Sequence, residues 1–311
     1  MSRRIAVATS LLTVSAAACS FGAYDAIVPY GKLNVADTAA LAVSADASTA
    51  FAVDQQATVG TWSESLKSFD ASSGNLLGEL TVTGTWTVAA LAPATNAATP
   101  GSVWTLHANG YRIRFDPSLS GSSFEQPIPL TGATTASART YCDMDRSDGI
   151  FFITTVDHSS AGAVAYLYRQ PREGAWERIE LTQLAGKCGR VATDETVSEV
   201  VVLDPYLDEV WVYDDESLSH LETIDVSGHG DFVTDIVATA GHTHVAVKVS
   251  NTEDLLVSFD DTGTLNDSTV VGELKAIAPH VDTATHSATL FWSGMDTWPV
   301  KYTVGSFELG Q

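Results

Sequence analysis

Short stretches in which apolar and polar residues alternate follow one another along the chain from about residue 41. They are four to seven residues long and rich in β-branched and aromatic side chains, and Gly, Asn, Asp or Pro separates them. Alternation places every second side chain on the same face, so each stretch predicts a half-buried β-strand. No sustained helical period appears after residue 18, and the pattern therefore predicts an all-β protein.

One arrangement of these strands recurs along the chain. An aromatic residue ends a strand, and in most repeats Asp and a turn follow it. The spacing between successive aromatics is 46, 53, 45, 46 and 43 residues. Repeats of about 40–50 residues with four strands each are typical of β-propeller blades. The sequence predicts a β-propeller with six four-stranded blades, or seven if one repeat is degenerate. The aromatics are Phe69, Phe115, Tyr168, Tyr213, Phe259 and Tyr302.

Acidic and amide residues recur at the strand ends. An Asp side chain can accept backbone N–H bonds from the residues that follow it, and Gly supplies a positive φ, so these residues are predicted to form turns rather than to catalyse. After the third strand the turns are 70–74 (DASSG) and 260–263 (DDTG). After the first strand the turn formers are Asp46, Asn96, Asp145, Asp194 and Asp282.

A ring of blades needs closure, because an open blade leaves an unpaired edge. The last repeat is short, so residues 27–35 (IVPYGKLNV) are predicted to complete the final blade. The expected organisation is a signal peptide over 1–18, an anchor, tether and closing strand over 19–36, and a single propeller domain over 37–311.

Two short segments resemble known propeller repeats. Residues 69–80 (FDASSGNLLGEL) are similar to quinoprotein-like repeats, although Gly78 stands where those repeats carry a tryptophan. Residues 44–54 (SADASTAFAVD) resemble YVTN-type surface-layer repeats. Each resemblance covers one hairpin per blade and implies the β-propeller fold without selecting a function.

The N-terminus has the features of a targeting segment. Arg3 and Arg4 precede an apolar run over 5–18, which is shorter than a membrane span. Three alanines precede Cys19, and this resembles the lipobox of bacterial lipoproteins, in which the cysteine is lipidated. The alternative is an ordinary signal peptide, and the twin-arginine route is not favoured because Ile5 follows the arginines. The expected location is the bacterial cell envelope, lipid-anchored and facing the periplasm or the exterior.

The acidic composition narrows the range of partners. The chain carries 16 Lys and Arg against 38 Asp and Glu, a net charge of −22, and loss of the two signal arginines makes it −24. Such a surface repels phosphate backbones, so nucleic acid is not an expected partner. No basic patch for anionic lipid appears, and membrane contact is expected through the lipid anchor only.

Two cysteines remain if Cys19 carries lipid. Cys142 and Cys188 are 46 residues apart, about one repeat, and lie in or beside the first strands of neighbouring repeats. An even pair in an oxidising compartment predicts a disulfide between adjacent blades. Two free buried thiols are the alternative.

Metal chemistry has weak candidates. His242 and His244 open a second strand, and His280 and His286 flank the matching turn of the next repeat. If these turns share one rim, four imidazoles would suit zinc or copper, and solvated turn histidines are the alternative. Residues 143–149 resemble a calcium loop only in part, because Gly149 is seventh rather than sixth. No cofactor is predicted, and calcium or zinc would be compatible with these residues.

No catalytic motif is present. Serine-hydrolase elbows, zinc-protease helices and phosphate loops are absent from the sequence. The first hypothesis is therefore a non-enzymatic lipoprotein that binds or scaffolds a protein or a glycan. The alternative is a divalent-metal-dependent hydrolase or lactonase of the six-bladed type. The missing repeat tryptophans weaken the hypothesis of a quinone-dependent dehydrogenase.

Overall fold

A computed structural model gives the fold. It describes residues 28–29 and 38–306, apart from residues 59–60, 83, 95–98, 130–137, 172–173, 195, 231, 251–253, 261, 273–275, 283–286 and 295–296. Cys19 and the predicted signal peptide lie outside the described residues. Within the described part, no helix has the length and apolar character needed to cross a membrane.

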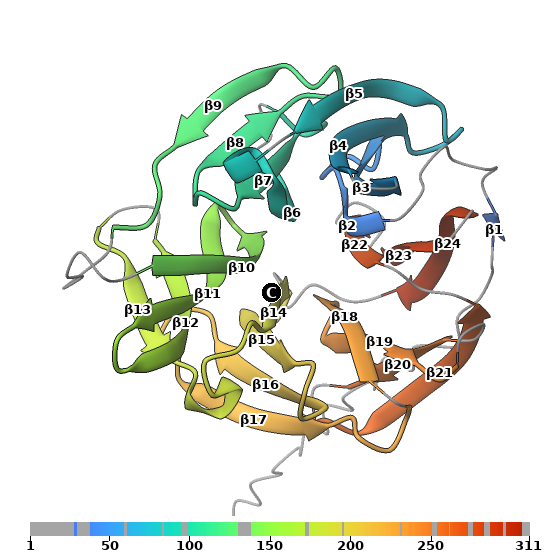
Figure 1. The fold of residues 1–311 in the computed structure, drawn as a ribbon. Coiled ribbons are helices and arrows are strands. Elements are labelled where there is room, and N and C mark those ends of the chain that lie inside the picture. The colour runs from blue at the N-terminus through green and yellow to red at the C-terminus, as the bar shows by residue number, and fades with distance from the viewer. Residues whose placement is uncertain are drawn as a thin grey trace, which may run out of the picture.

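Five blades follow one another around a central axis (Figure 1). Each is an antiparallel sheet of four consecutive strands in sequence order, with the first strand innermost. Blade 1 comprises β2 (Thr38–Val43), β3 (Thr49–Thr58), β4 (Thr61–Asp70) and β5 (Leu76–Val82). Blade 2 comprises β6 (Val88–Pro93), β7 (Val103–His107), β8 (Arg112–Phe115) and β9 (Gly121–Glu125). Blade 3 comprises β10 (Ala138–Ser147), β11 (Ile150–Ser159), β12 (Gly162–Gln170) and β13 (Glu177–Glu180).

The remaining two blades repeat this order. Blade 4 comprises β14 (Arg190–Asp194), β15 (Glu199–Asp204), β16 (Glu209–Asp214) and β17 (His220–Asp225). Blade 5 comprises β18 (Phe232–Thr239), β19 (His242–Lys248), β20 (Asp254–Phe259) and β21 (Leu265–Gly272). Two single-turn 3₁₀ helices, η1 (Gly84–Trp86) and η2 (Thr182–Leu184), connect blades 1 and 2 and blades 3 and 4.

The remaining sheet closes the ring and is built differently. Three consecutive strands, β22 (Ala276–Asp282), β23 (Ser287–Gly294) and β24 (Thr297–Ser306), are joined at the outer edge by β1 (Val28–Pro29). In β1 only Val28 and Pro29 pair, opposite Lys301 and Val300. We call this the closing sheet.

The predicted blade count is therefore corrected. Six four-stranded blades were expected, the last of them completed by residues 27–35, with seven blades as the alternative. Five blades are four-stranded units of consecutive strands, and the closing sheet reaches four strands only through a distant two-residue segment. The repeat spacing misled the count, because it registers a recurring third strand and does not show whether a fourth strand follows it.

The hydrophobic core lies between the blades. One cluster joins Ala192, Val212 and Ile224 of blade 4 to Ile236 and Val257 of blade 5. Similar clusters join blades 3 and 4, blades 2 and 3, blades 1 and 2, and blade 1 to the closing sheet. Second strands such as β7 are buried throughout, whereas outer strands such as β13 and β17 are mostly exposed. Burial on both faces explains why the middle strands are the most continuously apolar.

Turn chemistry after the third strands agrees with the prediction. Asp70 Oδ1 accepts the N–H groups of Ser72 at 3.1 Å and Ser73 at 2.8 Å, and Gly74 has φ 71°. Asp260 Oδ1 accepts the N–H groups of Thr262 and Thr264, both at 2.9 Å. These carboxylates shape hairpins, as an Asx turn does.

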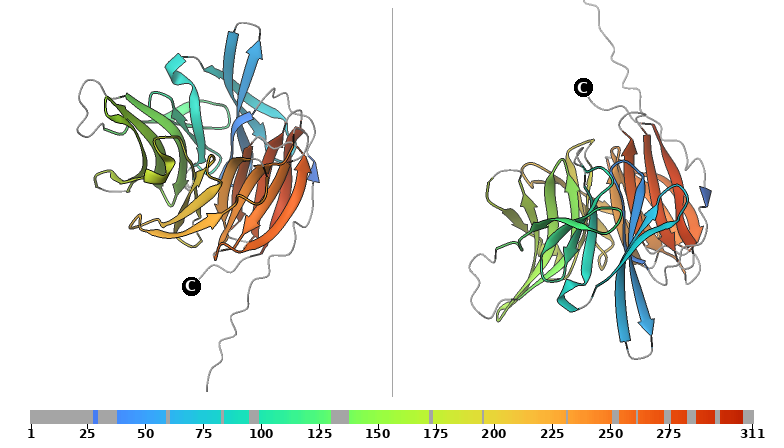
Figure 2. Two further views of the ribbon diagram at one scale, coloured as in Figure 1. Left: turned by 60° about the horizontal axis from the view of Figure 1, so that its bottom comes forward. Right: turned by 90° about the horizontal axis from the view of Figure 1, so that it is seen from above.

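Blade 1 carries an extended arm. Strands β3 and β4 are ten residues long and pair along their whole length, from Thr49 opposite Asp70 to Thr58 opposite Thr61. Figure 2 shows this hairpin projecting beyond the body of the propeller. The arm gives one end of the ring an irregular outline.

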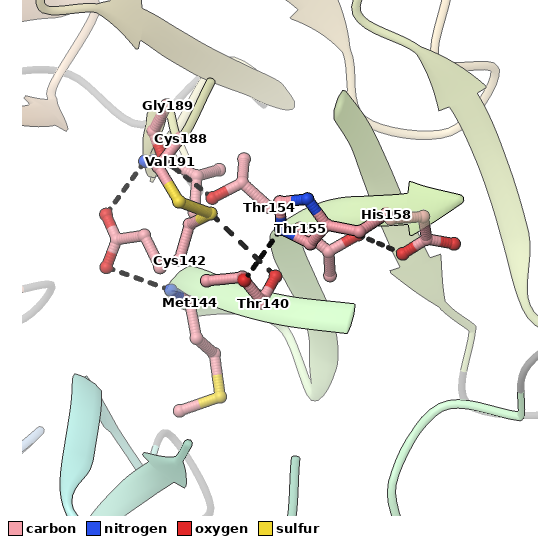
Figure 3. The surroundings of a disulfide bond; sticks show 11 residues. Thr140, Cys142, Met144, Thr154, Thr155, His158, Cys188, Gly189 and Val191 are labelled. Atoms are coloured by element: carbon pink, nitrogen blue, oxygen red, sulfur yellow. Dashed lines mark hydrogen bonds between the residues drawn. A yellow bond between two sulfur atoms is a disulfide. The ribbon is translucent and has the colours of Figure 1, made fainter. Parts of the chain in front are cut away.

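A disulfide joins blades 3 and 4, as predicted. Cys142 of β10 and Cys188, which follows η2, are bonded with a Cα–Cα distance of 5.4 Å (Figure 3). Nearby, Thr154 Oγ1 donates to the carbonyl of Gly189 at 2.8 Å. The bond fixes the approach of β14 to β10.

We predict that reducing this disulfide lowers the free energy of unfolding by about 3–4 kcal/mol, because it closes a loop of 46 residues in the unfolded chain. Urea unfolding with and without a reductant measures the change. The double variant Cys142→Ser/Cys188→Ser is the control, and reductant should not change its stability. Equal stability of the oxidised and reduced protein would contradict the prediction.

Candidate functional site in the central channel

The first strands of the five blades and of the closing sheet converge on the axis of the ring (Figure 1). Residues of these six strands line a cavity. Its volume is about 60 Å³, which is room for a few water molecules or a very small ligand. Drug-sized ligands occupy pockets of about 300–1,000 Å³. The cavity therefore limits any occupant to a few non-hydrogen atoms.

The lining has two chemically different sides. The apolar wall consists of residues 39–43 of β2, Leu91 and Pro93 of β6, and residues 277–279 of β22. The opposite wall, which we call the polar wall, comes from the consecutive inner strands β10, β14 and β18. It carries the charged residues of the lining, Asp143, Asp145, Arg190 and Asp235, together with the apolar residues Met144, Val191, Ala192, Ile236 and Val237. Every charged residue of the lining thus comes from three neighbouring blades.

The carboxylates of β10 bind the backbone of the next blade. Asp143 accepts the N–H of Met144 at 2.9 Å and the N–H of Val191 at 2.9 Å (Figure 3). Asp145 accepts the N–H of Arg146 at 2.8 Å and that of Thr193 at 2.8 Å. In each carboxylate, one oxygen accepts an amide of β10 and the other accepts an amide of β14. Each carboxylate therefore clamps blade 3 to blade 4.

The same clamp recurs at the next two boundaries, between blades 4 and 5 and between blade 5 and the closing sheet. Asp235 accepts the N–H of Ile236 at 3.0 Å and, across the blade boundary, that of Ile277 at 2.9 Å. Asp194 accepts the N–H of Thr196 at 2.8 Å and that of Gly241 at 2.7 Å. The acceptor and the donor of the next sheet are 42 to 48 residues apart, about one repeat.

Asp145 is a correction to the predicted turn formers. It lies within β10, which continues to Ser147, and the turn falls at Asp148 and Gly149, both with positive φ. Asp46 and Asp194 do bond turn amides, those of Ser48 and Thr196. Asn96 lies outside the described residues. The calcium-loop resemblance also fails, since Asp143 and Asp145 each hold backbone amides of β14.

Burial raises the pKa values of the acids of the polar wall. These side chains are half-buried and meet solvent only through the cavity. Loss of hydration raises the pKa of Asp145 to about 7, against the lowering effect of its hydrogen bonds with Arg146 and Thr193. Burial likewise raises the pKa of Asp143 to about 6 and that of Asp235, although Arg190 lowers both. At neutral pH the channel holds more negative charge than its single cation balances.

Arg190 lies between two acids from different blades. Burial alone would lower its pKa, but the charges of Asp143 and Asp235 outweigh burial and raise it. Among the described residues no carboxylate oxygen lies within 4 Å of its guanidinium, and no hydrogen bond is made to it. Arg190 and Asp235 were not singled out from the sequence. The repeated pattern of an acid before an apolar residue, in 141–145 (YCDMD) and 233–237 (VTDIV), is the signal that could have found Asp235.

The predicted histidines do not come together as a described group. His242 and His244 are buried in β19 with ring centroids 6.2 Å apart, and burial lowers the pKa of His244 to about 3. His280 is half-buried in β22. His286 lies outside the described residues. The described part of the chain holds no group of three or more His, Cys, Asp or Glu side chains suited to a metal ion. The four-histidine site stays a prediction.

Comparisons with known proteins agree on the fold. No protein-family model matches the chain, and no curated protein matches it. Among solved structures, a luciferin-regenerating enzyme has a TM-score of 0.61 and 14% identity, covering 92% of this chain and 98% of that one. The β-propeller domain of Cps50 (Swd1) from Myceliophteria thermophila has a TM-score of 0.55 and 10% identity, covering 90% and 100%. Raptor from Chaetomium thermophilum has a TM-score of 0.57 and 10% identity, covering 92% of this chain and 29% of that one. At these identities the likeness shows the fold alone, a β-propeller.

We predict that Asp145→Asn flattens the loss of stability between pH 4 and pH 7. The folded-state pKa of about 7 is above the ordinary value of 3.8, so the stabilising contribution is complete below the unfolded pKa and is lost as pH rises through 7. An Asn cannot ionise, and the decline between pH 4 and pH 7 should shrink by about 3 kcal/mol. Urea unfolding at several pH values measures it.

Asp70→Asn is the matched control. Hydrogen bonds from Ser72 and Ser73 lower the pKa of exposed Asp70 to about 2. Its contribution is present above pH 4 and is lost as pH falls toward 2, so this variant should leave the range from pH 4 to 7 unchanged. An unaltered slope in Asp145→Asn would refute the assignment.

Proposed function

We propose that this protein is a lipid-anchored β-propeller of the bacterial cell envelope, and that it binds a protein or a glycan without catalysing a reaction. The observation that carries the proposal is a cluster of exposed aromatic side chains on blade 2. The arginine-rich sector of blade 3, which adjoins it, supplies the second part of the argument.

The aromatic patch consists of Trp86, Tyr111 and Phe124. The Trp86 and Tyr111 rings are stacked with centroids 5.6 Å apart, and the ring centroids of Phe124 and Tyr111 are 4.8 Å apart. Trp86 is 41% exposed and Phe124 is 53% exposed. Aromatic rings carry much of the contact area at protein interfaces, and their polar atoms also suit sugars.

Local structure holds the patch in place. His107 Nδ1 donates to the carbonyl of Trp86 at 2.6 Å and so fixes η1 against the end of β7. In the β7–β8 turn, Asn109 Oδ1 accepts the N–H of Tyr111 at 3.1 Å, and Gly110 has φ 84°. Three separate segments are thus held together as one rigid surface.

Charge is distributed unevenly along the chain. Residues 112–190 hold nine Lys and Arg and nine Asp and Glu, whereas the rest of the chain after residue 18 holds five cations and 29 acids. A sector without net charge, rich in Arg and aromatic residues, has the composition typical of a protein interface. All arginines after residue 18 fall in this sector: Arg112, Arg114, Arg139, Arg146, Arg169, Arg172, Arg178 and Arg190.

The patch and the arginine sector are continuous. Gly110 packs directly against the Tyr141 ring, so a side chain at this position would collide with it. Arg139 lies two residues before Tyr141 on β10, and its guanidinium is 5.9 Å from the ring. Because Tyr141 and the Arg139 side chain are buried, these contacts fix blade 3 against blade 2 beneath the aromatic patch.

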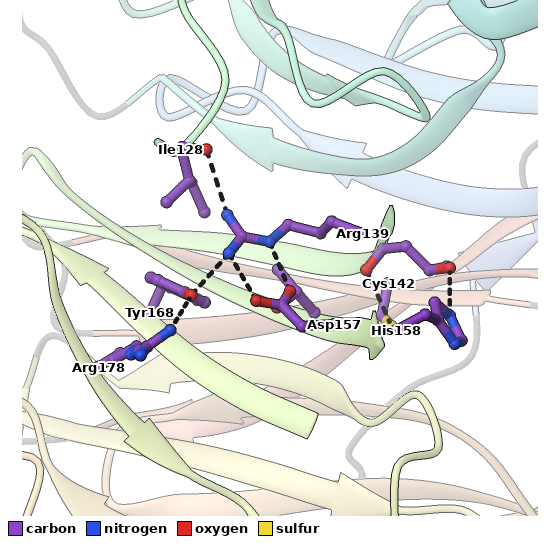
Figure 4. A network of polar contacts seen from close by, with 9 residues as sticks. Ile128, Arg139, Cys142, Asp157, His158, Tyr168 and Arg178 are labelled. Atoms are coloured by element: carbon purple, nitrogen blue, oxygen red, sulfur yellow. Dashed lines mark hydrogen bonds and ion pairs between the residues drawn. The ribbon is translucent and has the colours of Figure 1, made fainter. Parts of the chain in front are cut away.

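On blade 3 a largely buried ion-pair network supports exposed Arg178 (Figure 4). Arg139 donates to both oxygens of Asp157, at 2.6 and 2.7 Å, and to the Tyr168 hydroxyl at 2.7 Å. The same hydroxyl accepts from Arg178 at 2.9 Å. Arg178 is exposed and lies 4.5 Å from the Tyr166 ring centroid. Such preorganised arginines lose little freedom on binding.

The N-terminal sequence that precedes the propeller supports the envelope location. The basic residues, the apolar run and the alanines before Cys19 favour export and lipidation. The Cys142–Cys188 disulfide is consistent with an oxidising compartment. Blades 2 and 3 would then present the patch to partners at the membrane surface.

The alternative is a divalent-metal-dependent hydrolase acting in the channel. The fold likeness to a luciferin-regenerating enzyme is too distant to select it. Each channel acid accepts a backbone amide of the neighbouring sheet, and this linking of blades favours a structural role. Stoichiometric calcium or zinc in the purified protein would favour the hydrolase.

We predict that a photo-reactive phenylalanine analogue at position 124 captures one discrete partner in the native host. Phe124 and Leu221 are equally exposed, at 53% and 52%, so the analogue at position 221 is the matched control and should give no discrete adduct. Trp86→Ala should reduce the adduct several-fold, because the indole supports the patch. Gel mobility after protease or glycosidase treatment distinguishes a protein from a glycan. Equal labelling at both positions would rule out this surface.

We predict that Cys19→Ala moves the protein from the membrane fraction to the soluble fraction, because the acyl chains are its expected membrane contact. Fractionation and fatty-acid labelling measure the two effects together. Ser20→Ala should retain both the label and the membrane location. An unlabelled wild-type protein would contradict lipidation while leaving the binding proposal intact.

A further inference from the structure

The central cavity contains a cation whose donors are not used by the described protein groups. The Arg190 side chain is half-buried, borders the cavity, and makes no hydrogen bond or ion pair within 4 Å among the described residues. A guanidinium has five N–H donors, and those of Arg190 are left to whatever occupies the cavity. Its environment therefore favours a group that brings acceptor oxygens.

Acids stand on either side of this arginine. Asp143 on β10 and Asp235 on β18 interact with its charge from the two neighbouring blades. Each carboxylate accepts two backbone N–H bonds, and a carboxylate has about four lone-pair sites. Each can therefore accept further bonds from a donor in the cavity.

The charge balance excludes two simple occupants. A small anion would meet Arg190 but would be repelled by Asp143, Asp145 and Asp235. A small cation would suit the acids but would leave the arginine donors unused. It would also place a second positive charge beside the arginine. The described residues also offer no group of three or more metal ligands. A molecule that carries both a negative and a positive group can bind the arginine and the acids at the same time.

Size and shape narrow the class further. The volume of about 60 Å³ admits only a few non-hydrogen atoms. Opposite the charges, the lining is Leu41, Leu91, Pro93 and Ala278, which present hydrocarbon. The occupant should have its charged groups adjacent to one another and a small apolar or hydroxyl side chain.

We propose that the central cavity binds a small zwitterion in which an ammonium group adjoins a carboxylate, namely a free α-amino acid of the size of glycine, alanine or serine. Its carboxylate accepts from the Arg190 guanidinium, and its ammonium group donates to Asp143 and Asp235. The side chain faces the apolar wall. This site is separate from the aromatic patch, so it does not rest on the proposed partner binding.

Calorimetric titration of the full chain with L-alanine, glycine and L-serine tests the proposal. Saturable binding of at least one of them is expected. Propionate and ethylamine each lack one charge of alanine, and both should bind at least tenfold more weakly. L-Tryptophan is too large and should not bind. Absence of saturable binding by all three amino acids, or equal binding of alanine and the single-charge analogues, would overturn the proposal.

Variants assign the site to its residues. Arg190→Gln should weaken alanine binding at least tenfold, and Asp235→Asn should weaken it similarly. Arg169→Gln is the control, because Arg169 pairs with Glu177 at the outer edge of blade 3, and it should bind alanine as the wild type does. Circular dichroism identifies any variant that does not fold, and the ligand series on the wild type then decides alone. Unchanged affinity in folded Arg190→Gln would refute the assignment.

Discussion

Each blade of this protein has apolar faces that only a neighbouring blade can cover. The large buried side chains, such as Phe51, Phe152 and Trp211, lie in clusters between blades. A single four-stranded sheet could bury little of this surface, and the ring arrangement buries it on both sides. The same requirement explains the closing sheet, because β24 without β1 would leave an open edge.

The carboxylate clamps specify how adjacent blades meet. Apolar contact between twisted sheets tolerates sliding, whereas a carboxylate that holds an amide of its own strand and one of the next strand fixes the register between them. Asp143, Asp145 and Asp235 do this at the axis, and the Cys142–Cys188 bond adds a covalent link at one boundary. The cost is repulsion between acids in a narrow channel with a single balancing arginine. The ammonium group of the proposed zwitterion would offset part of this negative charge.

Local signals predicted much of this structure, and long-range ones did not. The strand pattern, the Asp–Gly hairpin turns and the cysteine spacing of one repeat all report on residues close in sequence or on a regular period, and the structure agrees with them. The blade count was wrong because the aromatic repeat marks third strands and not complete blades, and the last repeat has only three consecutive strands, β22 to β24. Asp145 was assigned to a turn because sequence defines strand ends poorly. In addition, β10 is longer than the first strands of the other blades.

The candidate sites were harder to foresee, for a related reason. Arg190 and Asp235 belong to different repeats and meet only because inner strands converge on the axis. The aromatic patch combines a 3₁₀ segment, a turn and an outer strand, and no periodicity connects Trp86, Tyr111 and Phe124. Both sites depend on the ring being closed and on neighbouring blades keeping their register.

Amide hydrogen exchange tests that dependence most directly. The account predicts that the amides of Val191, Thr193 and Ile277, which donate across blade boundaries, exchange as slowly as those of the buried strand β15 and far more slowly than those of the outer strands β13 and β17. Exchange of these three amides at the rate of the outer strands would contradict the central claim that the blades are clamped to one another at the axis.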